Sequence, residues 1–225
     1  MIGTIANTCT ILLGSLLGSI FKKGIKKEHQ DALYTAMGLA ATGLGINAVV
    51  QNMPASNYPV LFIASLAIGS LLGTILDVDG HFQKLADRLS VGSLSKGLST
   101  GILLFCIGTL SILGPIQAAL YQDHTYLFTN ATLDFVTSMV LASTYGRGMM
   151  LTAPVLFCWQ GSIYLLAKLL GDFMSADMMT ELSIVGGFLI ASSGISILNI
   201  KNIKTMNMLP SLIVPVIFCA IAGMF

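Results

Sequence analysis

The chain has 225 residues, of which 55% are hydrophobic and only 9% are charged, and its mean hydropathy is +0.85. A water-soluble domain carries about a quarter charged residues, so this composition excludes a soluble globular protein. The net charge is +1 and the basic residues fall in loops rather than in a cluster, which argues against nucleic acid as a partner.

The apolar residues form blocks of roughly 17 to 22 residues, the length that crosses about 30 Å of hydrocarbon as a helix. Short polar connections separate the blocks. We therefore expect an all-α polytopic membrane protein, with a single transmembrane domain over residues 1–225 and about eight transmembrane helices. The expected helices cover residues 4–21, 34–51, 59–77, 99–120, 126–145, 148–170, 183–200 and 207–225.

The longest polar stretch runs from Asp77 to Lys96. It contains the amphipathic sequence HFQKLADRL, in which apolar residues recur at helical spacing. We expect this sequence to form a short helix that lies along the membrane interface.

Basic residues separate sharply between alternate loops. The loops after the first, third, fifth and seventh helices hold ten of the 11 Lys and Arg, and the opposite loops hold only Lys168. Because cytoplasmic loops carry the excess of Lys and Arg, we expect these four loops inside and both termini outside. The ten residues are Lys22, Lys23, Lys26, Lys27, Lys84, Arg88, Lys96, Arg147, Lys201 and Lys204.

A short glycine motif recurs in the chain. The sequence GSLLG occupies Gly14–Gly18 and again Gly69–Gly73, and a Gln160-Gly161-Ser162 sequence lies in the sixth helix. Each is followed by a Gly-rich helix, and the third hairpin would be inverted relative to the first two. Inverted hairpin repeats are common in secondary transporters. The alternatives are chance similarity and close helix packing, which small residues at this spacing also favour.

Asp134 is the one acidic residue deep inside an apolar block. It lies about eight residues, or roughly 12 Å, from the outer end of the fifth helix. An ionised carboxylate there is costly unless it faces a polar cavity, a partner or an ion. Asn130, Thr137 and Ser138 share its helix face and offer the oxygen ligands of a hard cation such as Na⁺, or of a proton relay. The alternative is a protonated aspartate that only packs against a neighbouring helix.

Prolines mark two further helices. We expect Gly114-Pro115 to interrupt the fourth helix, and Pro154 to do the same in the sixth helix, because proline removes a backbone donor. Broken helices line the binding sites of transporters. An ordinary kink is the alternative. These helices add five residues to the candidate ion or substrate path, namely Gly114, Pro115, Gln117, Gln160 and Gly161.

The other polar residues indicate little chemistry. Asn7, Asn47 and Asn199 lie near helix ends, where we interpret them as caps or as interhelical hydrogen-bond residues. The histidines fall in loops and the four cysteines show no metal-ligand spacing, so we expect no metal site and no cofactor. Hydrolase motifs such as GxSxG and HExxH are absent, which argues against an enzyme and predicts no catalytic residue.

Several dispersed segments resemble a known family. They are MIGTIANTCTILLGSLLGSIFKKGI, FCIGTLSILGPIQAAL, LDFVTSMVLASTYGRGMMLTAPVLFCWQGS and GGFLIASSGISILNIKNIKTMNMLPSLIVP. Together they look like the bacterial membrane family called domain of unknown function 554, the YqgA-like proteins. The family's motif positions fall on Gly108, Gly114, Gln117, Asp134, Gly146, Gln160, Gly161, Gly187, Asn199 and Pro210. An acidic residue that the family usually has beside Gln117 is absent here, which argues against an ion site that needs two carboxylates.

The resemblance implies a bacterial cytoplasmic membrane and no established activity. From the residues, our leading hypothesis is a small ion-coupled transporter or channel-like carrier that binds a monovalent cation or a proton at Asp134. The alternative is a non-transporting membrane scaffold or accessory subunit. The lipid bilayer is the expected surrounding, and exposed small-residue faces would permit a homodimer.

Overall fold

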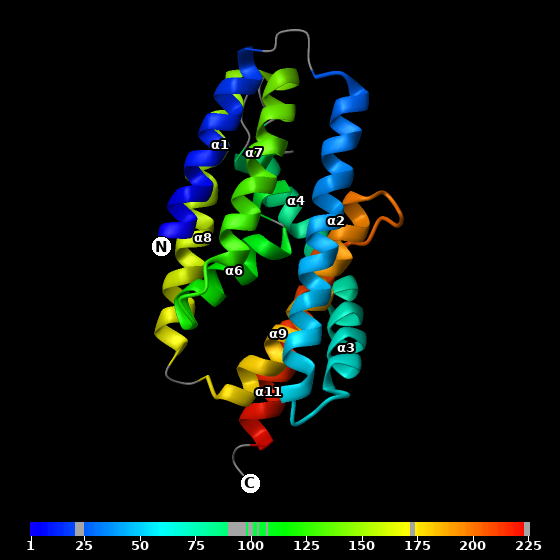
Figure 1. Cartoon of the computed structure of the whole chain (residues 1–225). Helices are drawn as coiled ribbons and strands as arrows, with labels where there is room; N and C mark the ends of the chain where they lie inside the picture. The colour runs from blue at the N-terminus through cyan, green and yellow to red at the C-terminus, as the bar shows by residue number, and fades with distance from the viewer. Residues whose placement is uncertain are drawn as a thin grey trace. The chain divides into compact units, whose positions relative to one another are not determined.

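The computed structural model describes residues 1–20, 25–89, 98, 101, 102, 104–106, 108–171 and 174–222, with residues 85–89 described by their backbone alone. Within these ranges every regular element is a helix, which confirms the expected all-α class (Figure 1). The basic residues Lys22, Lys23 and Lys96 and the side chain of Arg88 lie outside the described residues.

A helix lies at each of the eight expected places. The first seven places hold α1 (Ile2–Ile20), α2 (Lys27–Asn52), α3 (Leu61–Ile75), α6 (Thr109–Leu120), α7 (Thr125–Tyr145), α8 (Thr152–Leu170) and α9 (Ala176–Ile197). The eighth place is divided into α10 (Thr205–Met208), the 3-10 helix η4 (Leu209–Leu212) and α11 (Ile213–Ala222). The 3-10 helices η1 (Met53–Ala55) and η2 (Arg147–Leu151) follow α2 and precede α8.

The expected count of eight spans is not reached. Among the described residues, five helices are long and apolar enough to cross a membrane, or six if one bent pair is a single span. Asn130 and Asp134 lower the hydropathy of α7, and α6 has only 12 residues because the chain leaves the helical conformation at Gly108. The bent pair is α3 with the start of α4 (Val78–Leu89), and Asp77 at its break has a φ of 44°.

The polar stretch after α3 forms the expected short helix, α4. It begins three residues earlier than the HFQKLADRL sequence predicts. The backbone N–H of Asp79 donates to Oδ1 of Asn207 at 2.8 Å, and its carboxylate lies 3.8 Å from Nζ of Lys204. These contacts tie the start of α4 to the segment around α10.

The described helices group into two compact units. Unit 1 comprises Met1–Leu33 and Phe82–Gly171 and is built around α1, α6, α7 and α8. Unit 2 comprises Tyr34–His81 and Asp172–Phe225 and is built around α2, α3, α9 and the α10–α11 segment. Each unit combines two separate stretches of the chain. The expected single domain over residues 1–225 stays a prediction.

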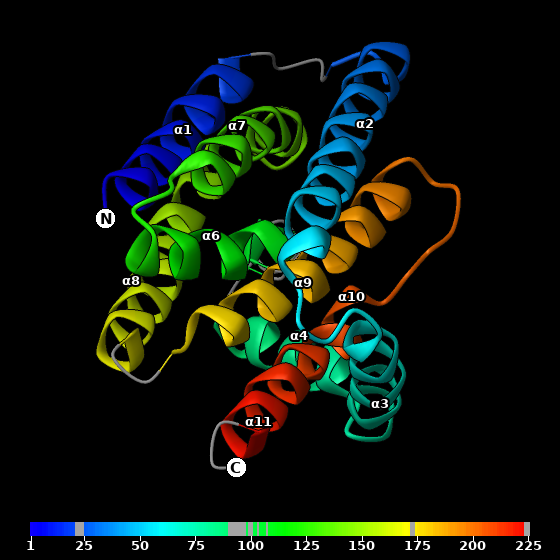
Figure 2. The same cartoon turned by 60° about the horizontal axis from the view of Figure 1, so that its bottom comes forward.

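In unit 1, α1 and α7 lie side by side and run in the same direction (Figures 1 and 2). A Cβ at Gly14 would overlap the carbonyl oxygen of Phe135, and a Cβ at Gly18 would overlap that of Met139. Glycine therefore allows the two backbones to touch. The packed core of this unit includes Ile11, Phe105, Met149 and Leu156.

In unit 2, the second GSLLG motif makes a similar contact on α3. A Cβ at Gly69 would overlap Ser211 of η4, and a Cβ at Gly73 would overlap the carbonyl oxygen of Asn207 in α10. Residue number rises along α3 as it falls along its partner, so these segments are antiparallel. Both copies of the motif thus serve close helix packing, which is the alternative use that the sequence left open.

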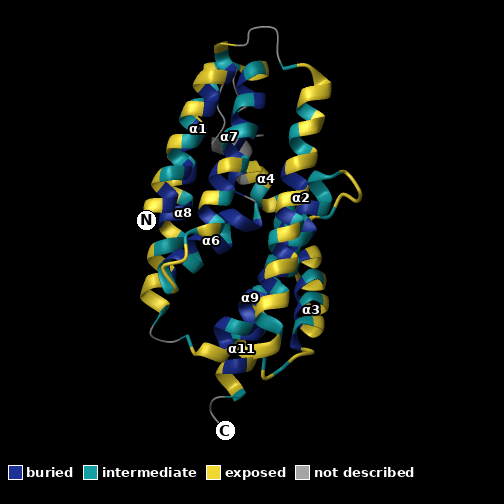
Figure 3. Cartoon of the chain, in the orientation of Figure 1, coloured by how far each residue is buried: buried dark blue, intermediate teal, exposed yellow. Residues whose placement is uncertain are grey.

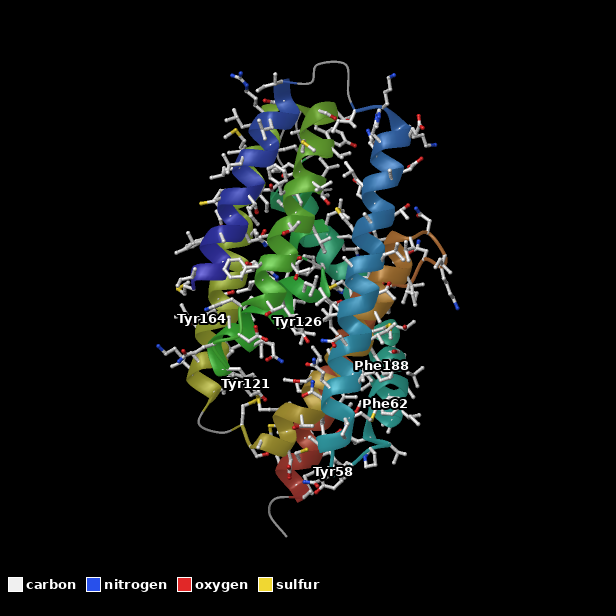
Figure 4. All side chains as sticks on the ribbon, viewed as in Figure 1. Tyr58, Phe62, Tyr121, Tyr126, Tyr164 and Phe188 are labelled. Carbon is white, nitrogen blue, oxygen red and sulfur yellow. The ribbon has the colours of Figure 1, made fainter. Side chains whose placement is uncertain are left out.

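α9 makes the remaining contacts of unit 2. It packs antiparallel to α2, because Gly38 lies against Leu198 while Gly45 lies against Ala191. The rings of Phe62 on α3 and Phe188 on α9 stack with centroids 4.8 Å apart (Figure 4). α9 is thereby buried along most of its length.

Large apolar side chains stand exposed on the outer faces of several helices (Figure 3). Ile2 is 68% exposed, Leu71 62% and Leu169 74%. Soluble monomers rarely expose apolar surface on this scale. Hydrocarbon is the solvent that stabilises such a surface, which supports the membrane interpretation.

The glycine contact between α1 and α7 predicts the effect of a single methyl group. Gly18→Ala should destabilise the protein by about 1–3 kcal/mol or more, because the Cβ meets backbone that cannot move alone. Gly43→Ala is the matched control, since a Cβ there has no neighbour within 4 Å, and it should leave stability unchanged or raise it by up to about 1 kcal/mol, because alanine has the higher helix propensity. Unfolding in mixed SDS micelles measures both. Equal effects of the two variants would contradict the packing described here.

Candidate functional site

Asp134 lies near the middle of α7 and is only 5% exposed. Its Oδ2 atom accepts two hydrogen bonds, one from Nδ2 of Asn7 on α1 and one from Nδ2 of Asn130 on α7, both at 2.9 Å. Asn7 and Asn130 are themselves 0% and 5% exposed. We call these three residues the Asp134 cluster.

The glycine contact described above positions this cluster. Because α1 and α7 run in parallel and touch through Gly14 and Gly18, the Asn7 amide reaches α7 at the level of Asp134. The hydroxyl of Thr10 donates to the backbone carbonyl of Asn7 at 2.8 Å and lies 3.5 Å from its side-chain oxygen. Asn7 thus forms an interhelical hydrogen bond, which is one of the two roles that the sequence predicts for it.

The two amides stabilise negative charge on one carboxylate oxygen without supplying a positive charge. Among the described residues the one ion pair joins Lys204 to Asp79, so no Lys or Arg there neutralises Asp134. A buried carboxylate that lacks a countercharge is costly, and amide donors offset only part of this cost. The arrangement therefore suits a carboxylate that takes up a small cation or a proton.

A break in the helix lies beside the cluster. Residues 104–106 are helical, but Gly108 has a φ of −55° and a ψ of 134°, and α6 begins at Thr109. A Cβ at Gly108 would lie 4.0 Å from Oδ1 of Asn130. Non-helical backbone thus reaches the Asp134 cluster, and an interruption of this kind frees backbone polar groups.

The expected interruption at Gly114-Pro115 is wrong. Both residues are buried inside the continuous helix α6, where Gly114 packs against Leu127 and Pro115 is accommodated without a break. Gln117 lies two residues further along the same helix. Pro154 does not interrupt α8 either. It lies in the first turn of the helix, where a backbone N–H has no intrahelical acceptor, so the missing N–H of proline costs no hydrogen bond.

Gln160 forms a second polar group in unit 1. It lies on α8, is 0% exposed, and donates from Nε2 to the hydroxyl of Ser111 on α6 at 3.1 Å. Its Oε1 has no hydrogen-bond partner within the described ranges. Gly161 is also buried and lies near the side chain of Met1. A buried acceptor without a donor is a place where a ligand or water can bind.

The other two residues of the predicted oxygen face, Thr137 and Ser138, form no hydrogen bond with Asp134 in the described structure. Ser138 donates its hydroxyl to the carbonyl of Phe135 at 2.9 Å and lies against Gly14, so it contributes to the α1–α7 contact. Thr137 is buried on α7. The structure thus brings Asn130 to Asp134, and their role as ion or substrate ligands stays a prediction.

The sequence missed Asn7 as a partner of Asp134 and missed Glu181 altogether. The expected helix over residues 183–200 leaves Glu181 in the preceding loop, whereas α9 begins at Ala176 and Glu181 is 1% exposed. The early start is readable in Ser175, whose side chain caps the helix by accepting from the N–H of Met178.

Comparison with known proteins gives a family but no activity. The family model described as "Protein of unknown function (DUF554)" matches residues 2–220. The uncharacterized membrane protein YdfK of Bacillus subtilis is 58% identical over 215 residues, which is 96% of this chain and 94% of that protein. The uncharacterized protein YqgA of Escherichia coli is 27% identical over 224 residues, covering 95% and 94%. No solved structure matches the chain.

The Asn7–Asp134 hydrogen bond predicts a measurable coupling. Asn7→Ala should destabilise the protein by about 1–3 kcal/mol, because a buried carboxylate loses a donor. In an Asp134→Asn background the same change should cost about 1 kcal/mol less. Asn47→Ala on the exposed face of α2 is the control and should have little effect. Additive costs in the SDS unfolding cycle would argue against the coupling.

Proposed function

The chain belongs to the DUF554 family, and from this premise we propose that it is a small ion-coupled transporter or channel-like carrier. Asp134 serves as its binding site for a monovalent cation or a proton. The observation that carries the proposal is the buried Asp134 carboxylate, which is held by two amides and lacks a positive partner in the described structure.

The break at Gly108 supports this assignment. Secondary transporters bind their coupling ions at discontinuous helices, where unwound backbone carbonyls join side-chain oxygens. In unit 1 the non-helical Gly108 lies near the side-chain oxygen of Asn130, whose amide nitrogen donates to the Asp134 carboxylate. Gln160 and Ser111, on helices of the same unit, offer further polar atoms for a path through it.

We propose that the basic loops lie in the bacterial cytoplasm and both termini outside; the helix directions within each unit agree with the alternation of spans on which this orientation rests. Loop charges assign the same direction to α1 and α7, and opposite directions to α2 and α9 and to α3 and the segment formed by α10 and η4. The glycine contacts run parallel in the first pair and antiparallel in the other two. We place the protein in the bacterial cytoplasmic membrane because the similar protein YdfK is a bacterial membrane protein.

A non-transporting scaffold or accessory subunit is the second candidate. The observation that favours it is that Asn7 and Asn130 already satisfy Oδ2 of Asp134 by hydrogen bonds, of which the bond from Asn7 also joins α1 to α7. We further propose that the protein is not an enzyme, and that its exposed faces would permit a homodimer.

Reconstitution in liposomes tests the transport proposal. Flux of ²²Na⁺, of ⁸⁶Rb⁺ in place of K⁺, and of protons with an internal pH dye should exceed that of protein-free liposomes for at least one ion. Asp134→Asn should reduce that flux to the protein-free level, because the amide cannot carry the negative charge. Glu28→Gln, an exposed acidic residue on α2, should leave it unchanged. Flux that persists in Asp134→Asn would rule out the role of Asp134, and no flux of any ion would favour the scaffold.

Reporter fusions test the orientation. Alkaline phosphatase fused after residue 225 should be active and green fluorescent protein at the same point should be dark, because the C-terminus is proposed to lie outside. Fusions after Arg147 should give the opposite result. A fluorescent fusion after residue 225 would contradict the orientation.

A further inference from the structure

Unit 2 contains a buried acidic residue that the proposed function does not use. Glu181 lies in the second turn of α9 and is 1% exposed. Among the described residues, Glu181 and Asp134 are the two buried acidic side chains, one in each unit.

The segment that follows η1 holds one of the two carboxylate oxygens. The hydroxyl of Ser56 donates to Oε1 of Glu181, and the backbone N–H of Tyr58 lies 3.4 Å from the same atom. Nδ2 of Asn57 donates to Oδ1 of Asp177, one turn earlier on α9, at 3.0 Å. The segment is thus fastened to two acidic residues of α9.

An aromatic contact steadies this segment from the other side. The Tyr58 ring meets the Phe218 ring of α11 edge to face, with centroids 4.9 Å apart and an interplanar angle of 80°. Contacts with Glu181 of α9 and Phe218 of α11 hold Ser56 and Tyr58 in place, so the donors to Oε1 of Glu181 are fixed. The geometry of the carboxylate is therefore set before any ligand arrives.

The second carboxylate oxygen has no such donor. Oε2 of Glu181 is buried and lacks a hydrogen-bond partner in the part of the chain that the structure describes. No Lys or Arg in that part pairs with it, since the one ion pair there is Lys204 with Asp79. A half-satisfied buried carboxylate is costly, so a partner from outside the chain would stabilise it.

We propose that Glu181, with Ser56, forms a binding site for a monovalent cation of the Na⁺ class. Hard cations prefer oxygen ligands, and the free Oε2 offers one that already carries charge. The described residues contain no group of three or more His, Cys, Asp or Glu that could hold a metal, which disfavours a divalent ion. This site uses residues of unit 2 alone and does not depend on the role of Asp134.

Sodium binding to the purified full-length protein in detergent tests this site. Bound ²²Na⁺ is counted by scintillation proximity, and the melting temperature is compared in NaCl and in choline chloride at equal ionic strength. Both measurements are made in the wild type and in Asp134→Asn, so that any ion bound at Asp134 is counted separately. We expect Na⁺ to be bound, and to raise the melting temperature, in both proteins.

Two variants locate the ion. Glu181→Gln should weaken the Na⁺ affinity of the Asp134→Asn protein at least about tenfold, because the charged ligand is lost. Ser56→Ala, which keeps the carboxylate, should weaken the Na⁺ affinity about three- to tenfold. If Glu181→Gln does not fold, an unchanged Na⁺ affinity in Ser56→Ala would overturn the proposal. Glu28→Gln is the exposed control and should bind as its parent does.

Unchanged Na⁺ binding in a folded Glu181→Gln protein would overturn the proposal. So would the absence of both bound ²²Na⁺ and a Na⁺-dependent melting shift from the Asp134→Asn protein, since Oε2 would then carry a proton instead. Failure of this site leaves the ion flux through Asp134 to be judged separately, because the flux assay compares Asp134→Asn with the wild type.

Discussion

The close approach of α1 and α7 is the constraint on which the Asp134 cluster depends. Gly14 and Gly18 let the two backbones touch, and a larger residue at either position would overlap a carbonyl oxygen of α7. Only at this separation does the short amide of Asn7 reach the Asp134 carboxylate. A methyl group added at Gly14 or Gly18 would therefore separate the two helices and weaken the Asn7–Asp134 hydrogen bond, without contacting the carboxylate itself.

Sequence reasoning predicted what local pattern determines. It placed helices at the eight observed places and singled out Asp134, because one acidic residue in an apolar block is conspicuous. It could not pair Asn7 with Asp134, since the two are 127 residues apart. It placed the break in the fourth helix at Pro115, whereas the chain leaves the helix at Gly108. Proline is a visible signal, but packing decides whether a helix accommodates it.

The two buried acidic residues differ in the hydrogen-bond donors that surround their carboxylates. Asp134 receives two amide donors on one oxygen, whereas Glu181 receives a hydroxyl on one oxygen and nothing from the described chain on the other. No acidic residue flanks Gln117 in the sequence. Glu181 shows that a second buried carboxylate is nonetheless present, although it lies in the other unit.

Infrared difference spectroscopy tests the central claim most directly, because it detects ion or proton uptake by the Asp134 carboxylate itself. Protein labelled with ¹³C at the aspartate side-chain carboxyls separates aspartate bands from those of Glu181. On exchange of Na⁺, K⁺ or protons, the account predicts an aspartate band change that disappears in Asp134→Asn. Spectra without an aspartate band, or with the same band in that variant, would contradict it.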